Sequence, residues 1–300
     1  MKRIVAIFTA FAACLSAGTM LNAAEKQYEY DLASFNAIKV GGNFEVIIEK
    51  GSAYHASVTV DEACYKLVTC SVKGNTLTLT EDDKDITKEI KNLLNNTQPV
   101  FKAVVTVPVS PDEIVINDKA VVECSVLCEG CNVKVSVSDN ASLKNFTANC
   151  KYFSLKVDKR SNVNVNVTAD DVDVDMNNTS SVSLTQKGKA IDINLAAASN
   201  FTLYGNSEEM TLNSKGSAKA LLNGEATKAK YTITGSCNIN ASALIGDNAE
   251  VKMTGLSTAN VAAAKNLSVN IQSGATLIFS NSPVFEIVQV KASTLKPAEK

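Results

Sequence analysis

The densest group of chemically active side chains is a run of aspartates at residues 170–175, which read Asp-Asp-Val-Asp-Val-Asp. Alternate residues of a strand share a face, so inward valines would place Asp171, Asp173 and Asp175 on the outer face, about 6.6–6.8 Å apart. Asp192 follows Asp173 by 19 residues. Calcium prefers oxygen ligands, so Asp171, Asp173, Asp175 and Asp192 are a candidate calcium site.

The same aspartates could form the carboxylate pair of a glycoside hydrolase, because the expected spacings suit either a retaining or an inverting enzyme. A flat, wet strand face, however, provides no burial to raise the pKa of one acid, and few aromatic residues for sugar stacking lie nearby. Repulsion between exposed carboxylates about 4.8 Å apart costs only about 1 kcal/mol in water, so no ion is required. We expect a solvated acidic face.

Two further residues are candidates for catalysis. His55, the single histidine, lies in an expected strand with no serine or cysteine nucleophile arranged around it in sequence. Arg160, at a corner of the repeat, could act as the base of a polysaccharide lyase, but such enzymes carry several basic residues beside a calcium-binding acidic cluster. The sequence therefore predicts no catalytic residue and no cofactor.

Seven of the eight cysteines lie beyond residue 24, and this odd number leaves at least one thiol unpaired. Cys124, Cys128 and Cys131 form a Cys-x3-Cys-x2-Cys cluster that could hold a metal, but no histidine lies nearby to complete a zinc set. Cys131 and Cys150 are 19 residues apart, and Cys124 stands 19 residues before Leu143. We therefore expect the cysteines to occupy structural registers, buried or disulfide-linked.

A period of 19 residues runs from about Asp139 to Phe279. Apolar residues at this spacing form three sets: Val163, Val182, Phe201, Ala220 and Ile239; Val165, Leu184, Leu203, Leu222 and Ala241; and Leu155, Val174, Ile193 and Leu212, followed by Ile233 and Met253 after slips of one or two residues. Apolar and polar residues alternate within each repeat, which indicates strands with one buried face. A fixed period near 20 is typical of a solenoid. The sequence predicts an all-β protein, a parallel β-helix with Val163, Val182, Phe201 and Ala220 in one interior column.

Four segments are expected along the chain. Residues 1–24 have the basic start, apolar run and small residues of a secretory signal peptide, with a lipid anchor at Cys14 as the alternative. Residues 25–113 form a β-rich N-terminal cap region with one short helix at about 84–96. Residues 114–291 form the β-helix, with about eight rungs from 117 onward, and 292–300 form a flexible tail. The apolar runs beyond residue 24 are too short to span a bilayer.

The charge balance argues against one class of partner. The chain has 29 basic and 31 acidic residues, and the basic residues form no stripe. A nucleic acid is therefore not an expected partner.

The opening pattern at 35–51, Phe-x-x-Ile-x-Val-x-Gly-x-Phe-x-Val-x-Ile-x-x-Gly, is followed by Tyr54 and by Val-Thr-Val at 58–60. Small polar residues then punctuate the repeats, most clearly in Gly-Ser-Cys-Asn-Ile-Asn at 235–240. These features resemble the auto-transporter adhesins with a head GIN domain, a family common in gut Bacteroidetes. The resemblance covers about 35–246, and arguably extends to Phe279. It implies a pectin-lyase-like β-helix at the cell envelope with an adhesive role, and it carries no catalytic residue across.

The expected function is that of an exported, non-catalytic protein at the cell surface or outer membrane. Small polar side chains would form a regular face suited to weak contacts repeated along a glycan or a matrix protein: Thr202, Thr211, Asn213, Thr232, Thr234, Asn240, Ser268 and Asn270. Asn and Thr stacked between rungs can also bond to one another along the solenoid axis. The alternatives are a carbohydrate-active enzyme and a periplasmic structural module. The sequence indicates no oligomeric state.

Overall fold

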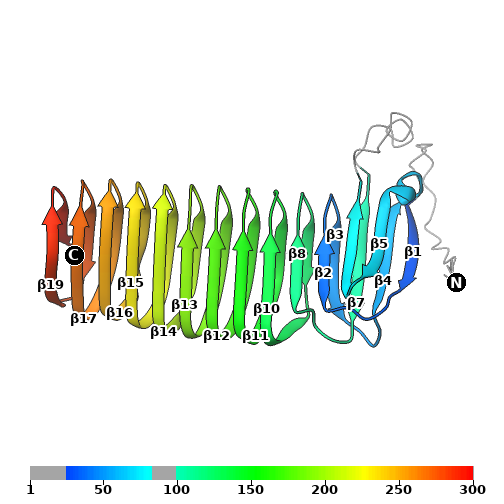
Figure 1. The fold of residues 1–300 in the computed structure, drawn as a ribbon, viewed down its shortest axis with the longest axis horizontal. Helices are drawn as coiled ribbons and strands as arrows, with labels where there is room; N and C mark the ends of the chain where they lie inside the picture. The colour runs from blue at the N-terminus through cyan, green and yellow to red at the C-terminus, as the bar shows by residue number, and fades with distance from the viewer. Residues whose placement is uncertain (1–24, 83–98, 300) are drawn as a thin grey trace, which may run out of the picture.

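The computed structural model describes residues 25–82 and 99–299. It is 74% strand and 2% helix, and the strands form a β-solenoid of about 10 turns. Figure 1 shows the strands side by side in one long row, with the N-terminal elements at one end and the C-terminus near the other. The predicted signal peptide (1–24) and the predicted helix (84–96) both lie outside the described residues.

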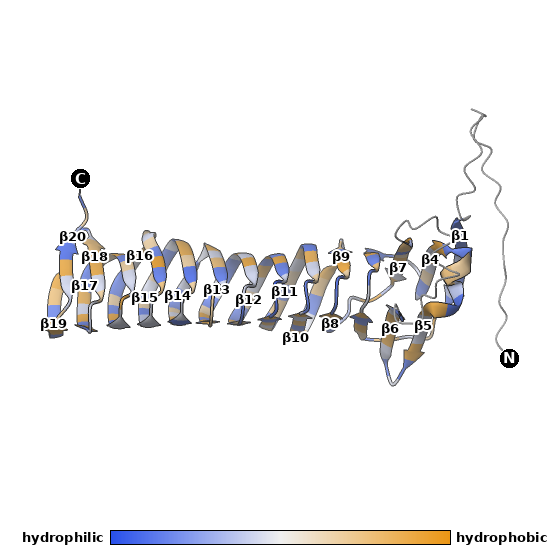
Figure 2. Cartoon of the chain, turned by 90° about the horizontal axis from the view of Figure 1, so that it is seen from above, coloured by the Kyte–Doolittle hydropathy of each residue, from blue (hydrophilic) through white to orange (hydrophobic). Residues whose placement is uncertain are grey.

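Long strands with alternating burial build the solenoid, one rung each. They are β10 (Leu127–Val137), β11 (Ser142–Val157), β12 (Asn162–Met176), β13 (Ser181–Leu195), β14 (Asn200–Gly216), β15 (Lys219–Gly235), β16 (Asn238–Gly255) and β17 (Thr258–Gln272). Consecutive members of this series pair in parallel. Each strand bends midway, so its first half lies in one sheet, called here the first sheet, and its second half in the opposite, second sheet (Figures 1 and 2).

The predicted interior column is present. Val163 is paired with Val182, Val182 with Phe201 and Phe201 with Ala220, and all four side chains are at most 5% exposed. Each apolar side chain is covered by the same position of the next rung, about 4.8 Å away, which is how a two-sided stack removes its apolar surface from water. The predicted parallel β-helix is confirmed.

One slip in the predicted register is wrong. Leu212 is paired with Tyr231, not with Ile233, so the 19-residue step continues unbroken at this point. The longer step comes one rung later, where Tyr231 is paired with Val251 and Ile233 with Met253. An irregularity in the ladder between Leu221 and Asn223 absorbs the extra residue.

A column of small residues fills the tight corner where each rung turns from the second sheet back to the first. Its members are Ala120, Ala141, Ser161, Ser180, Ser199, Ala218, Cys237, Ser257 and Ala275, and each is at most 2% exposed. The carbonyl of a corner residue accepts a backbone hydrogen bond from the next rung, for example Ser181 N to Ser161 O at 2.9 Å. Left-handed backbone at nearby turn positions, including Asn178 and Gly216, lets the chain reverse in so few residues.

The parallel ladder begins earlier than the predicted boundary at 113/114. β2 (Ala37–Val40) pairs in parallel with β8 (Glu113–Ile116), and β3 (Glu45–Lys50) with β9 (Val121–Cys124). The β2–β3 segment alternates as a rung does and turns at Gly42, whose φ is 74°. The solenoid therefore has about 10 turns rather than the predicted eight rungs, partly because this segment contributes to it.

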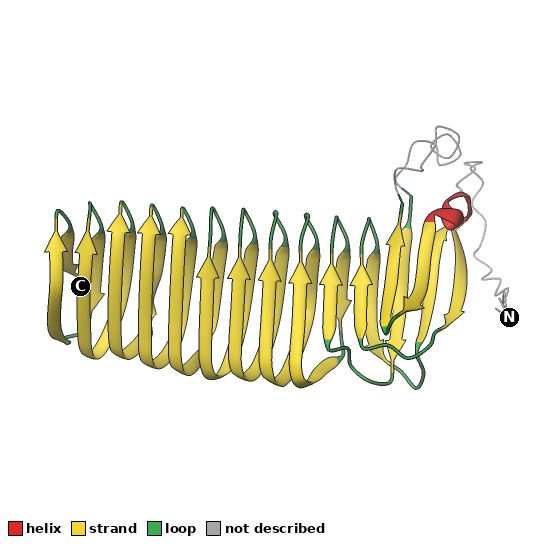
Figure 3. Cartoon of the chain, in the orientation of Figure 1, coloured by secondary structure: helices red, strands yellow, loops and turns green. Residues whose placement is uncertain are grey.

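Antiparallel strands close the N-terminal end. β1 (Glu25–Asp31) pairs with β4 (His55–Asp61), β4 with β7 (Phe101–Val107), and β5 (Val68–Lys73) with β6 (Thr76–Glu81). A short 3₁₀ helix, η1 (Glu62–Leu67), follows β4 and is the red element in Figure 3. No helix in the described part of the chain has the length and apolar character needed to cross a membrane.

The predicted flexible tail at 292–300 is wrong in part. Thr294–Pro297 forms β20, which pairs in parallel with β18 (Thr276–Ser280). The next-to-last rung is completed by β19 (Val284–Lys291), which pairs with the second half of β17. Leu295 packs against the core, and this contact helps to hold the segment in register with the solenoid.

Candidate functional site

The aspartate run lies on β12, in the second sheet, with the expected orientation. Val172 and Val174 are buried, while Asp173 and Asp175 are half-buried on the outer side and Asp171 is exposed. Asp192 of β13 is paired with Asp173, but the neighbour of Asp171 is Ala190. The four predicted calcium ligands are therefore spread over several register positions rather than gathered around one point.

The contacts of these acids are with the protein itself. Asn194 donates to Asp175, and the Tyr152 hydroxyl donates to Asp173 over 3.3 Å. Among residues 25–82 and 99–299, no group of three or more His, Cys, Asp and Glu side chains is arranged to hold a metal ion. The calcium site stays a prediction, without support from this arrangement.

The electrostatics of Asp173 differ from the sequence-based expectation. Burial raises the pKa of this carboxyl, and the neighbouring charges of Asp175 and Asp192 raise it further, while the bond from Tyr152 and the charge of Lys156 act in the opposite direction. The expectation that this strand face offers no burial to raise an acid's pKa was wrong. The sequence also did not reveal that the hydroxyl of Tyr152, one rung earlier, donates to this carboxylate.

A ladder of polar side chains runs along the solenoid axis from Asp175. The side-chain amide of Asn194 donates to Asp175 at 3.1 Å, and the side-chain amide of Asn213 donates to the side-chain Oδ1 of Asn194, also at 3.1 Å. Thr232 occupies the same position on the next rung. Stacked polar bonding of this kind was expected, but Asn194 was not singled out, although it lies 19 residues from both Asp175 and Asn213.

The ladder lines a groove of about 570 Å³ on the outer side of the second sheet. Lys156, Lys215 and Thr234 contribute to its walls, and parts of Met176 and Leu195 are apolar lining. A second groove, of about 870 Å³, lies further along the same sheet towards β19. It is lined by residues that include Thr211, Ser268 and Asn270 of the expected polar face. Together the grooves follow the second sheet over several rungs.

The expected polar face is divided between the two sheets. Thr202 is paired with Leu221, and Leu221 with Asn240, in the first halves of their strands. These two polar residues therefore lie in the first sheet, while the other six predicted face residues lie in the second. Leu221, 38% exposed, interrupts the polar column between them.

Ion pairs neutralise the charges around the second groove. Lys228 contacts Glu209 at 2.7 Å, and Glu250 contacts Lys252 at 2.6 Å and Lys230 at 3.9 Å. The bond from Lys252 lowers the pKa of Glu250. Partial burial raises this pKa, and the charge of Lys230 lowers it further. The charges around the second groove therefore largely balance one another.

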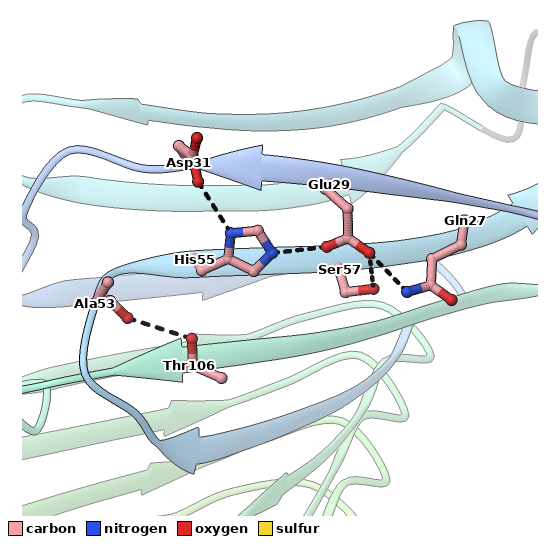
Figure 4. Close-up of polar contacts among 7 residues, drawn as sticks. All are labelled: Gln27, Glu29, Asp31, Ala53, His55, Ser57 and Thr106. Atoms are coloured by element: carbon pink, nitrogen blue, oxygen red, sulfur yellow. Dashed lines mark hydrogen bonds and ion pairs between the residues drawn. The ribbon is translucent and has the colours of Figure 1, made fainter. Parts of the chain in front are cut away.

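His55 belongs to a different cluster, on the antiparallel strands β1 and β4 (Figure 4). Its Nε2 lies 2.6 Å from Glu29 Oε2, and its Nδ1 lies 3.3 Å from Asp31 Oδ1. Ser57 and Gln27 both donate to the other oxygen of Glu29. Burial raises the pKa of Glu29, but the bonds from His55, Gln27 and Ser57 outweigh it and lower the pKa overall. Sequence analysis missed these partners because an antiparallel pairing leaves no periodic signal.

The cysteines occupy mixed environments. All seven of those described are free thiols, and Cys124 and Cys128 are buried and each lie within weak hydrogen-bond distance of the Val126 carbonyl, at 3.7 and 3.9 Å. The predicted shared register of Cys131 and Cys150 is wrong, because Cys150 is paired with Gly130 and Cys131 is exposed. The rung is 20 residues long here, so the 19-residue spacing misleads. Leu143 is likewise paired with Val122 rather than Cys124.

Arg160 lies where it was expected, at a rung corner, with a left-handed φ of 62°. It belongs to the turn between β11 and β12, whereas Asp173 and Asp175 lie in the second half of β12. Arg160 therefore has a structural role in this turn.

The profile of one protein family, described as "Putative auto-transporter adhesin, head GIN domain", matches residues 34–186 and 175–283. These matches span more than half of the chain. The chain belongs to this family. The resemblance predicted from the opening pattern and the worn repeats is thereby confirmed, and the head GIN family brings with it the description of an adhesin.

Three solved structures are similar to this chain. A protein from Parabacteroides merdae, described as "a putative adhesin", is 18% identical, with a TM-score of 0.53, over 93% of this chain and 98% of that one. A "putative adhesin" from Parabacteroides distasonis is 19% identical, with a TM-score of 0.47, over 92% of this chain and 98% of its own. A "Putative lipid binding protein" from the same species is 18% identical, with a TM-score of 0.42, over 93% and 98%. No curated protein matches.

Proposed function

We propose that this chain is an exported, non-catalytic adhesion protein whose second sheet binds an extended polar polymer, a glycan or a matrix protein, along the solenoid axis. The observation that carries the proposal is the ladder from Asp175 through Asn194 and Asn213 to Thr232, which lines a groove parallel to that axis. Membership of an adhesin-described family supports it.

The geometry suits a partner that repeats. Equivalent side chains on successive rungs are separated by about 4.8 Å, so each rung offers a similar weak contact. Contacts of this kind gain strength when many act together on one linear molecule, which suits a flat face better than a deep pocket would. A polymer should therefore bind far more tightly than its short fragments.

A binding experiment tests the proposal directly. Residues 25–300 would be immobilised and exposed to mucin glycans, glycosaminoglycans, pectins and matrix proteins, each as the polymer and as short fragments. The double substitution Asn194→Ala with Asn213→Ala should weaken polymer binding about tenfold or more, as expected when adjacent contacts of a multivalent face are lost. Thr202→Ala, on the first sheet, is the matched control and should leave binding unchanged. Equal loss in both variants, or no binding to any polymer, would contradict the proposal.

The alternative function is a carbohydrate-active enzyme, and one observation favours it. Burial, and then the charges of Asp175 and Asp192, raise the pKa of Asp173. Glycosidases use such a pair, in which an acid with a raised pKa lies beside a second carboxylate. A reducing-end or unsaturated-product assay on the same polymers decides between the two. Turnover that disappears in Asp173→Asn would establish the enzyme and overturn the non-catalytic proposal.

The proposed location is the cell surface, with the periplasm as the rival. Protease treatment of intact cells followed by detection of this chain separates them. Digestion in intact cells supports the surface, whereas protection that is lost only after rupture of the outer membrane would refute an adhesive role towards external partners.

A further inference from the structure

The C-terminal end of the solenoid is an open strand edge. β19 pairs on one side with β17, and in Figure 1 it is the outermost strand of the row. All eight residues of β19 are exposed. A strand edge of this kind has backbone donors and acceptors that are free to pair with another strand.

The apolar columns of the core run out to this edge without cover. Leu267 is paired with Phe285, Val269 with Ile287, and Ile271 with Val290. The three β17 residues are fully buried, but Ile287 is 58% exposed and Val290 41%. Terminal repeats of a solenoid need a polar outer surface to remain soluble alone. The end formed by β19 is apolar instead, which is typical of a surface that meets a partner.

The other edge at this end is protected. β20, the terminal strand of the first sheet, ends in Pro297, which has no backbone N–H to donate and so discourages further strand pairing. β19 has no proline, although it carries the charges of Glu286 and Lys291. At the opposite end of the molecule, the first sheet ends in β1, which is paired with β4, and the second sheet ends in β5, which is paired with β6. Most residues of β5 are half-buried, whereas every residue of β19 is exposed.

The sequence of β19 is complementary to itself in one antiparallel register. With a two-fold axis between Val288 and Gln289, Glu286 would lie opposite Lys291 of a second copy, and Ile287 opposite the second copy's Val290. Directly opposed residues of an antiparallel pair share a face. The ladder with β17 shifts between Val269 and Asn270 and leaves Val288 without a β17 partner, so Ile287 and Val290 both continue interior columns although they are three residues apart. Glu286 and Lys291 both continue outer positions, so this register matches the faces as well as the charges.

A rival register is less favourable. Moving one strand by two residues brings Phe285 opposite Val290 and keeps the apolar faces matched, but it places Glu286 opposite Gln289 and leaves both charges without an opposite partner in the ladder. In the two-fold arrangement the Glu286–Lys291 pair and the Ile287–Val290 pair each occur twice, because an isologous interface repeats every contact.

From these relationships we propose that β19 is a dimerisation strand. Two copies of the chain join at their C-terminal ends through an antiparallel β19–β19 pairing, which makes the second sheet continuous across both molecules. This dimer is independent of the proposed polymer binding, and its test does not require a ligand.

Sedimentation equilibrium of residues 25–300, over a series of protein concentrations, tests the dimer. The wild-type chain should approach twice its monomer mass as concentration rises. Ile287→Lys should remain monomeric, because it places a charge on the open apolar edge. Glu286→Lys should weaken the dimer by about tenfold or more, because it opposes two lysines at two symmetric positions. Glu286→Lys combined with Lys291→Glu should restore wild-type association, since it re-forms both pairs in reverse.

Glu49→Lys, an exposed charge reversal on β3 near the other end, is the matched control and should dimerise as the wild type does. Circular dichroism of each variant would establish that the monomer is folded. Hydrogen exchange should show β19 amides whose protection rises with protein concentration. A wild-type monomer at all concentrations would overturn the proposal, as would a dimer insensitive to both single substitutions. Concentration-independent protection of the β19 amides that do not bond to β17 would overturn it too, because it would mean that the chain covers its own edge.

Discussion

The side-chain amide of Asn194 donates to Asp175 on the preceding rung, while its carbonyl oxygen accepts from Asn213 on the following one. One residue thus connects three rungs by side-chain bonds alone. Because each net hydrogen bond contributes about 1 kcal/mol, Asn194→Ala should reduce the free energy of unfolding by about 1–2 kcal/mol. Asn213→Ala removes one of the two bonds and should cost about half as much. Urea denaturation measures both, and equal costs would argue that the loss is not set by the number of ladder bonds removed.

The corner column gives two serines with opposite expected responses. Ser180 donates to Asn177 O at 2.8 Å, but the buried Ser199 hydroxyl has no hydrogen-bond partner in the structure. Ser180→Ala should therefore lower stability by about 1 kcal/mol, whereas Ser199→Ala should leave it unchanged or raise it, since a buried unpaired hydroxyl is costly. Ala218, at the next corner, shows that alanine fits this column. Thermal melts compare the two, and a larger loss in Ser199→Ala would contradict this account.

The raised pKa of Asp173 predicts a pH-dependent effect of substitution. An acid whose pKa is raised on folding, here by burial and then by Asp175 and Asp192, favours the folded state in its protonated form. Its ionisation therefore lowers stability as pH rises from its unfolded pKa through its folded one. Asp173→Asn, which resembles the protonated form and can still accept from Tyr152, should raise the melting temperature at pH 7 and have little effect near pH 3. Asp171→Asn, on the exposed neighbouring position, is the control.

Glu29 should respond in the opposite sense. Its pKa is lowered by the bonds from His55, Gln27 and Ser57, which outweigh the effect of burial. The stability that it contributes is present above its unfolded pKa and is lost as pH falls through its folded pKa. Glu29→Gln should therefore lower the melting temperature at pH 7 and converge with the wild type in strong acid. A constant difference across the whole pH range would assign the effect to packing rather than to the charge.

Thiol labelling tests the environments of the cysteines. Under native, reducing conditions a maleimide should modify Cys131 first, because it is the exposed thiol among those described. Cys124 and Cys128 should react only when the chain is unfolded, since both are buried. Mass spectrometry of the labelled peptides measures the order, and Cys131→Ser should remove the fast phase. Rapid native labelling of Cys128 would show that this part of the solenoid opens.

Calcium addition checks the solvated interpretation of the acidic run. We expect the melting temperature to be the same in excess chelator and in millimolar calcium, because the aspartates are spread over several register positions. A calcium-dependent rise that is absent in Asp173→Asn would instead establish the metal site.

The sequence predicts the repeating part of this molecule well because there the spacing between two residues indicates whether they are paired on neighbouring rungs. Val163 and Val182 are 19 residues apart and are paired, so spacing alone identifies the column. Spacing fails where a rung gains a residue, as at Cys131, or where an apolar neighbour offers a false match, as Ile233 did for Leu212. The Glu29–His55 contact depends on antiparallel pairing and the bond from Tyr152 to Asp173 depends on side-chain reach, and no period encodes either.

The small corner residues, which let every rung turn in the same few positions, also make the length of this molecule easy to change. A rung that begins and ends at such a corner contacts only the rungs before and after it, so copying one 19-residue unit would insert a new layer without altering either end. Each insertion would lengthen the solenoid by about 4.8 Å. A lineage could therefore adjust the reach of such a protein by duplicating short stretches of its gene, while the closing strands at one end and β19 at the other stay as they are.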